Sequence, residues 1–174
     1  HRRNAQGGQI GATNLFALAD HRIFVGHVYY GKRVRGQDLR YLLRTGEAPF
    51  VPSENERERC SFYDTFPSEY SGNGVGDYRE SSIAVRTQDG QHAVMPTYVS
   101  YGITDQKPEL PGLPSAFDRE NTAQTLILHC RDEVLQLDVD LYYTVFEEND
   151  MITRSVRICN HSKEAVYLTK AYSA

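Results

Sequence analysis

The stretch from Asp64 to Arg79, DTFPSEYSGNGVGDYR, holds the side chains best suited to bind a polar ligand. An ionised carboxylate such as that of Asp64 can accept two hydrogen bonds from hydroxyl groups, and each charge-assisted bond contributes about 1.5–3 kcal/mol. Arg79 could donate to such a ligand directly, or hold Asp64 and Asp77 in a bidentate fork. The alternative for both residues is an internal salt bridge that braces the loop. We take Asp64 and Arg79 as the candidate ligand-binding residues.

Three glycines, Gly72, Gly74 and Gly76, occur in the second half of this stretch. Glycine allows the backbone to turn where a side chain would clash, so we expect the loop to hold its polar groups in a fixed array. Loops of this kind often carry function. The glycine spacing is shared with phosphate-binding loops, but the following helix and lysine are missing, which argues against a nucleotide site.

Other aromatic and acidic side chains are explained better by structure than by chemistry. Tyr70 and Tyr78 could each offer a ring face to a ligand, but tyrosines near strands more often pack in the core, and we expect both there. Asp138 and Asp140 lie two residues apart on one strand face, where a solvated surface is a simpler explanation than an acid/base pair. Three histidines lie within the expected strands: His27, His92 and His129. Their spacing is not that of metal ligands, so we expect neither a metal nor a cofactor.

Composition limits the class of protein. A chain of 174 residues can form one domain with a substantial core, and twelve tyrosines with seven phenylalanines favour a β-rich interior. The net charge of −4 argues against a nucleic-acid partner. No apolar run approaches the roughly 20 residues that span a bilayer, so we expect no membrane partner. Three cysteines without metal spacing fit a reducing cytoplasm. The chain begins at His1 rather than methionine, and we interpret it as a piece of something longer or as a product from which a tag was removed.

The apolar residues alternate with a period of two along most of the chain, which predicts antiparallel strands. The strongest case runs from Leu135 to Phe146. A polar turn at Glu147 to Asp150, a strand from Met151 to Cys159 and a third strand opening at Val166 would complete a three-stranded meander.

Earlier segments show the same period. Strands are predicted over residues 23–34 and 82–87 and around Leu126 to Cys130. Asp89-Gly90 is a hairpin signal, after which a strand over residues 92–103 is interrupted by Pro96, so that this strand is an edge or is bulged there. The only helix expected is a short one at residues 38–43. Together these segments predict one all-β domain.

The loop also resembles a motif of family 36 glycoside hydrolases, the microbial α-galactosidases, with the form D-x-x-x-x-E-Y-x(5)-G-D-[FY]-R. Four further blocks look like the N-terminal domain of this family and follow in its order: Tyr29 to Arg33, Leu110 to Pro114, Leu141 to Phe146 and Ile152 to Val156. The residues on the motif are Asp64, Glu69, Tyr70, Gly76, Asp77, Tyr78 and Arg79.

This resemblance implies a β-super-sandwich similar to galactose mutarotase, with predominantly antiparallel sheets. In the family this domain precedes a (β/α)8 barrel whose two aspartates hydrolyse the substrate with retention. Nothing here matches the nucleophile segment of that barrel, so we expect residues 1–174 to be the N-terminal β-super-sandwich domain, or its first part. No catalytic residue is expected in it, and alone it should be inactive.

The resemblance further implies a parent enzyme that releases terminal α-linked galactose from melibiose- or raffinose-type sugars. The family forms tetramers in which a loop of this domain reaches the active site of a neighbouring subunit, with Asp64 as the best candidate for contacting the galactoside. Two alternatives stay open. One is a stand-alone carbohydrate-binding β-sandwich, which the absence of tryptophan weakens. The other is a mutarotase-like epimerase, which would need a glutamate base and a histidine acid facing one groove.

Overall fold

The computed structural model describes residues 12–19, 24–32, 66–118 and 122–173. These residues form eight strands, and the helical element found among them is a single 3-10 turn, η3 (Glu147–Asn149). The strands are β1 (Ala12–Ala19), β2 (Phe24–Lys32), β3 (Ile83–Thr87), β4 (Thr97–Thr104), β5 (Gln124–Asp132), β6 (Leu137–Phe146), β7 (Met151–Asn160) and β8 (Val166–Ala171).

The largest sheet is antiparallel and has the order β4-β5-β6-β7. The period of two in β6 explains its orientation, because Leu137, Val139 and Leu141 are buried on one face while Asp138 and Asp140 lie on the other. Neighbouring strands continue the apolar face, with Leu128 of β5 directly opposite Leu141. The strand predicted over residues 135–146 is therefore confirmed from Leu137 onward.

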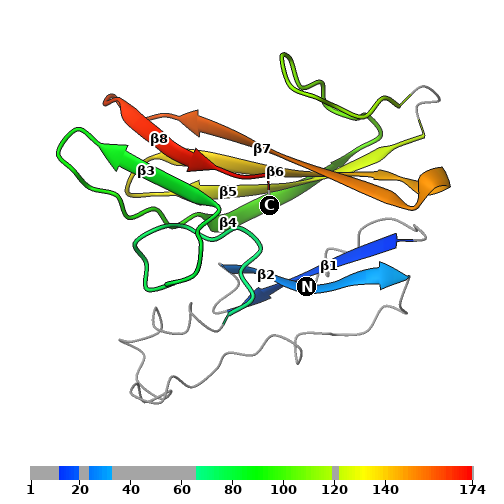
Figure 1. Ribbon diagram of the computed structural model, residues 1–174, viewed down its shortest axis with the longest axis horizontal. Helices are drawn as coiled ribbons and strands as arrows, with labels where there is room; N and C mark the ends of the chain where they lie inside the picture. The colour runs from blue at the N-terminus through cyan, green and yellow to red at the C-terminus, as the bar shows by residue number, and fades with distance from the viewer. Residues whose placement is uncertain (1–11, 20–23, 33–65, 119–121, 174) are drawn as a thin grey trace.

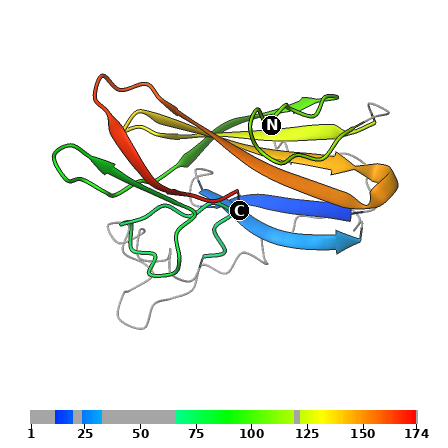
Figure 2. The same ribbon diagram turned by 45° about the horizontal axis from the view of Figure 1, so that its top comes forward.

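Two smaller antiparallel sheets, β1-β2 and β3-β8, form the second layer (Figures 1 and 2). Ile83 and Val85 of β3 belong to the same buried cluster as Leu141, and Val25 of β2 packs against that cluster. The chain is thus an antiparallel, strand-rich sandwich, as predicted. In the described residues its second layer consists of two separate pairs of strands and is not one closed sheet.

The predicted meander is wrong in its third strand. β8 crosses to the other layer and pairs with β3, so that Leu168 lies opposite Val85. The sequence places β8 just after β7, and short connections usually join neighbouring strands of one sheet. Here β8 instead contributes to the second layer that covers the apolar face of the large sheet, because a sheet with one apolar face must bury it against a second layer.

The predicted pairing around Asp89-Gly90 is also different. The turn forms, with Gly90 at φ +89° and the Thr87 amide donating to the Gln91 carbonyl at 2.9 Å. The returning strand, however, begins only at Thr97, after Pro96, and pairs with β5 rather than with β3. β4 is an edge strand, as predicted from Pro96, and the proline itself, which lacks the N–H that a ladder needs, lies just before the strand. The helix predicted at residues 38–43 lies outside the described residues.

A buried carboxylate joins the two layers. The side chain of Glu69, which is 1% exposed, accepts hydrogen bonds from three elements. Nδ1 of His27, on β2, lies 2.9 Å from Oε2, and the hydroxyl of Tyr143, on β6, donates to Oε1 at 2.8 Å. Arg154, on β7, also donates to Oε1. We call these four residues the Glu69 hub.

A cation–π contact and a tyrosine hydroxyl also hold the Glu69 hub together, in addition to the charges. The guanidinium of Arg154 lies 5.1 Å from the centre of the Tyr143 ring, within cation–π distance. Burial, and secondly the Glu69 charge, raises the pKa of Tyr143 above its ordinary value, so its hydroxyl stays a hydrogen-bond donor. Removing one partner from a buried, paired set of charges leaves the others uncompensated, which costs more than the pair contributes as a whole.

We expect Glu69→Gln to lower the free energy of unfolding by about 3 kcal/mol, because the arginine then loses its counter-charge in a largely dry position. Urea denaturation of the variant chain measures this. Glu80→Gln is the matched control, since Glu80 is 72% exposed and pairs with Lys170 at the surface; its effect should stay below about 1 kcal/mol. Equal effects of the two substitutions would show that the hub does not hold the layers.

Candidate functional site

The glycine loop is described from Phe66 to Arg79, and we call this segment the clasp. Its backbone is bonded to both strands of the second layer that flank it and to the segment before β4. The bonds are His27 N to Pro67 O at 2.7 Å, Glu69 N to Val25 O at 3.0 Å, Ser82 N to Ser71 O at 2.9 Å and Val94 N to Asn73 O at 3.0 Å. The clasp is therefore a fixed part of the sandwich.

Glycine is required in the clasp for two different reasons. At Gly72 a Cβ would lie only 1.7 Å from the carbonyl oxygen of Val94, so no side chain fits. Gly74 and Gly76 have φ angles of +77° and +89°, which side-chain-bearing residues rarely adopt. The three glycines therefore occupy positions where the backbone conformation or its close approach to Val94 disfavours a side chain.

Arg79 forms a bidentate fork with Asp77, which is the part of the predicted Asp64–Asp77 fork that lies within the described residues. Nε donates to Oδ1 at 2.8 Å and Nη2 donates to Oδ2 at 2.7 Å. Burial opposes ionisation of Asp77, but the hydrogen bonds and charge of Arg79 outweigh it, so the pKa of this carboxyl is lowered. The Asp77 side chain is 3% exposed and that of Arg79 is 48% exposed.

Arg79 also closes the clasp at its base. Its Nη2 donates to the carbonyl oxygen of Phe66 at 2.7 Å, which ties the two ends of the clasp together. Asp64 lies two residues before Phe66 and outside the described residues. Contact of either Asp64 or Arg79 with a ligand stays a prediction.

The two tyrosines of the clasp differ in position. Tyr70 is buried, as expected, and its hydroxyl donates to the Tyr172 carbonyl at 3.0 Å; burial raises its pKa to about 12. The expectation for Tyr78 is wrong, because this side chain is 92% exposed. Asp77 and Arg79 turn toward each other, and the residue between them is left pointing outward. Alternation along the chain, rather than residue type, is the signal that would have placed Tyr78.

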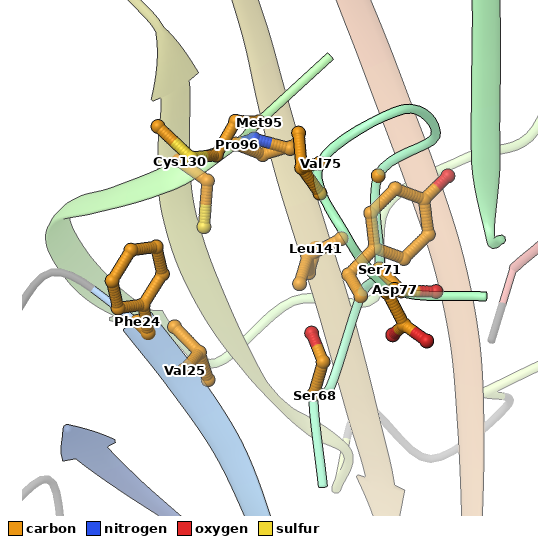
Figure 3. Close-up of a pocket in the computed structure, with 12 residues that line it drawn as sticks. Phe24, Val25, Ser68, Ser71, Val75, Asp77, Met95, Pro96, Cys130 and Leu141 are labelled. Carbon is orange, nitrogen blue, oxygen red and sulfur yellow. The ribbon is translucent and has the colours of Figure 1, made fainter. Parts of the chain in front are cut away.

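A small pocket lies between the clasp, β2 and the segment before β4 (Figure 3). Phe24, Val25 and Cys130 line one part of it, and Ser71 and Asp77 line another. Its volume of about 30 Å³ has room for one or two water molecules, whereas pockets for organic ligands occupy several hundred Å³. This pocket cannot enclose a sugar ring.

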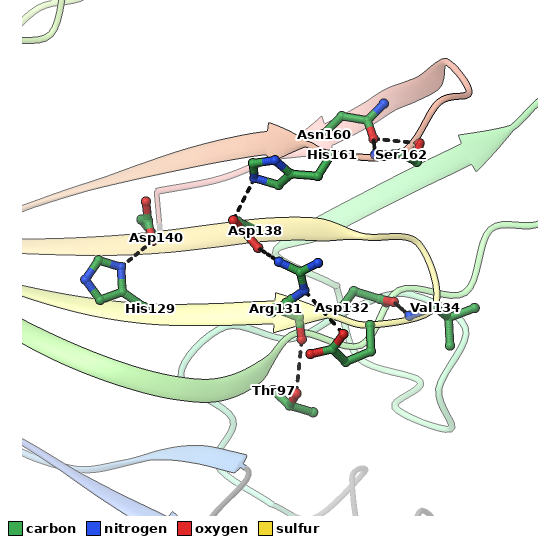
Figure 4. Close-up of polar contacts among 11 residues, drawn as sticks. Thr97, His129, Arg131, Asp132, Val134, Asp138, Asp140, Asn160, His161 and Ser162 are labelled. Atoms are coloured by element: carbon green, nitrogen blue, oxygen red, sulfur yellow. Dashed lines mark hydrogen bonds and ion pairs between the residues drawn. The ribbon is translucent and has the colours of Figure 1, made fainter.

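The carboxylates on the outer face of the large sheet are paired with basic side chains (Figure 4). Asp140 Oδ1 lies 2.6 Å from His129 Nδ1. Asp138 accepts from Arg131 at 3.0 Å and lies 2.7 Å from His161 Nε2. Both aspartates are thus engaged at a half-buried surface, in agreement with the structural interpretation. Within the described ranges, no group of histidine, cysteine and acidic residues could hold a metal ion.

The mutarotase-like alternative is disfavoured by the Glu69 hub. Its glutamate and histidine lie together, but both oxygens of Glu69 are occupied, one by His27 and the other by Tyr143 and Arg154. A general base must have an oxygen available to the substrate proton. Sequence reasoning placed Glu69 on the motif without a role, and the structure shows that the role is to hold the sandwich together.

The thiols of the described residues are free. Cys130 is buried and Cys159 is half-buried, while Cys60 lies outside the described residues. Burial, and secondly the charge of Asp140, raises the pKa of Cys130 to about 12, so this thiol is a poor nucleophile at neutral pH. Among the described residues, no helix is long and apolar enough to cross a bilayer.

Comparison with known proteins agrees with this fold. The sequence profile of the glycosyl hydrolase family 36 N-terminal domain matches residues 24–174, and the chain belongs to this family. The α-galactosidase Mel36A of Lactobacillus acidophilus is 39% identical over 153 residues, covering 86% of this chain and 21% of that protein. The chain therefore spans about a fifth of the length of such relatives.

Solved structures show the same arrangement of strands. The α-galactosidase AgaA of Geobacillus stearothermophilus superimposes with a TM-score of 0.83 at 29% identity, over 93% of this chain and 23% of AgaA. The galactosidase domain of the α-galactosidase–sucrose kinase AgaSK gives a TM-score of 0.81 at 33% identity, over 92% of this chain and 22% of that one. Variants of AgaA have been solved in complex with raffinose and with stachyose.

We expect Gly72→Ala to destabilise the chain by about 2–3 kcal/mol, because the Val94 backbone must move to admit the methyl group. Denaturant unfolding measures this loss. Gly102→Ala is the matched control: a Cβ there meets its nearest atom, His129 Nε2, at 3.8 Å, and the change should stay within about 1 kcal/mol. A tolerated alanine at position 72 would contradict the close approach described here.

Asp77 should make stability depend on pH in acid. Because the folded-state pKa is lowered, the stabilisation is complete above the unfolded pKa of about 3.9 and is lost as the pH falls through the folded value. The difference in unfolding free energy between the wild type and Asp77→Asn should therefore shrink between about pH 5 and pH 2. In an Arg79→Met background the same difference should be small at every pH; a persistent pH dependence there would assign the effect to another group.

Proposed function

We propose that this chain is the N-terminal, non-catalytic domain of a retaining α-galactosidase, which releases terminal α-linked galactose from melibiose- or raffinose-type sugars. The match of residues 24–174 to the family 36 N-terminal domain carries this proposal. Support also comes from the relatives, which are α-galactosidases about five times longer than the matched segment.

In this proposal the domain breaks no bond and contributes by placing Asp64. The clasp that follows Asp64 is bonded to β2 and β3, and Arg79 holds the Phe66 carbonyl at its base. A carboxylate at the end of such a fixed segment loses little freedom when it accepts hydrogen bonds from sugar hydroxyls. Correct orientation of the sugar against the catalytic groups then lowers the barrier.

We further propose that Asp64 serves a neighbouring subunit in a homotetramer. The small pocket beside the clasp supports this, since its volume of about 30 Å³ is too small to enclose the galactoside. The site must then be completed by another part of the enzyme. A cytoplasmic location and the absence of a cofactor stay predictions.

One observation favours the second candidate, a carbohydrate-binding domain that acts alone. Tyr78, which belongs to the clasp, is 92% exposed and could stack on a sugar ring. Titration of the isolated chain with galactose, followed by tyrosine fluorescence, separates the two proposals. Saturable binding that Tyr78→Ala abolishes would favour the binding domain, and its absence would favour the enzyme domain.

In the full-length protein, we expect Asp64→Ala to raise KM for an α-galactoside about 10- to 100-fold, because one or two charge-assisted hydrogen bonds to the substrate are lost. Expression should be unchanged. Steady-state kinetics with melibiose or raffinose measure the effect. Asp89→Ala, at the exposed turn after β3, is the control and should leave KM unaltered. An unchanged KM for Asp64→Ala would remove this residue from the substrate-binding site.

A further inference from the structure

The connection between β4 and β5 stands off from one end of the large sheet (yellow-green, upper right in Figure 1). We call residues 105–118 of this connection the arm. It contains the block Leu110 to Pro114, to which the proposed function assigns no role. Its construction and its surface together indicate a docking element.

The arm is rigid at both its base and its tip. At the base, Asp105 accepts a hydrogen bond from Gln124 at 2.9 Å, and Asp118 accepts one from the Ala123 amide at 2.9 Å. At the tip, the Leu113 amide donates to the Leu110 carbonyl at 3.1 Å across a turn in which Gly112 has φ +75°. Pro111 precedes this glycine, as in a type II turn.

This rigidity matters for binding because an ordered segment loses little conformational entropy when it docks. Prolines on both sides of the tip, Pro108 and Pro114, restrict the backbone further.

The second half of the arm, residues 110–117, is predominantly apolar. Residues 110–117 include no charged side chain, and Leu113 and Phe117 are 66% and 83% exposed. Single exposed apolar residues are normal on a protein surface. Leu113 and Phe117 are two large apolar side chains that lie close together in the sequence, on a short, uncharged segment with a defined conformation. Such a segment is suited to bury both side chains against a partner.

The small size of this apolar surface favours a partner that is covalently attached to the domain. A separate molecule needs an interface of roughly 1,000 Å² or more to bind stably, and the two large side chains of the arm alone do not provide this area. A covalently attached partner is present at a high effective concentration, so a small apolar contact suffices. The relatives offer such a partner, since the matched domain makes up about a fifth of their length.

We propose that the arm docks, through Leu113 and Phe117, onto an apolar surface of the part of the same polypeptide that follows residue 174. This inference rests on the proposed function, which supplies that following part. The docked arm fixes the orientation of the sandwich on the rest of the enzyme.

Photo-crosslinking in the full-length protein tests the proposal, with p-benzoylphenylalanine in place of Phe117. Position 134 is the matched control, because Val134 is 79% exposed on the turn between β5 and β6. From position 117 we expect crosslinks to peptides beyond residue 174, in a product with the mass of a single polypeptide on a denaturing gel. A product of doubled mass, crosslinks confined to residues 1–174, or a yield no higher than at position 134 would overturn the proposal.

Substitution gives a second measurement. Leu113→Ser and Phe117→Ser should each lower the melting temperature of the full-length protein by a few degrees, and Val134→Ser should leave it unchanged; equal effects would count against docking. Hydrolysis of an α-galactoside by the wild type tests the proposed function separately. Activity without crosslinking from position 117 would overturn the docking alone, and crosslinking without activity would overturn the assignment as an α-galactosidase alone.

Discussion

The carboxylate of Glu69 is a charge in an almost dry position, and the rest of the sandwich is arranged to satisfy it. Burying an ion is favourable only where several donors converge on it. The three donors come from β2, β6 and β7, and Tyr143 lies directly opposite Arg154 in the pairing of β6 with β7. A slip of that register by one residue would turn one of these donors to the other face of the sheet. The hub therefore specifies the register as well as the contact between layers.

The same constraint explains why the clasp is rigid. Glu69 lies near the start of the clasp, so satisfying its carboxylate fixes the segment against β2, and Tyr70 then fills the core beside it. Gly72 follows at a point where only backbone fits. The fork between Arg79 and Asp77 closes the far end onto Phe66. Most of the described residues of the motif thus hold the conformation of the clasp.

Local pattern predicted the strands well and their partners less well. Alternation identifies β5 and β6 because one face of each is buried and the other is not. It cannot show that β8 leaves β7 for β3, since either pairing would bury Val166. The Glu69 hub could not be predicted from local pattern for a related reason. The partners of Glu69 lie 42, 74 and 85 residues away in the sequence, and no local period connects them. Tyr78 was misplaced because residue type was weighed above its neighbours, whose mutual fork turns it outward.

The distribution of charges also indicates how such a domain can assist catalysis. Asp138 and Asp140 are paired with arginine and histidine side chains on the outer face, Glu69 is occupied on both oxygens, and Asp77 is held by Arg79. A carboxylate that is already saturated by fixed donors is a poor proton acceptor, because protonation would break bonds that the fold depends on. In the part of the chain that the structure describes, these four carboxylates serve the fold. Under the proposed function, any contribution of these four carboxylates to bond cleavage is therefore indirect, through the position in which the fold holds other groups.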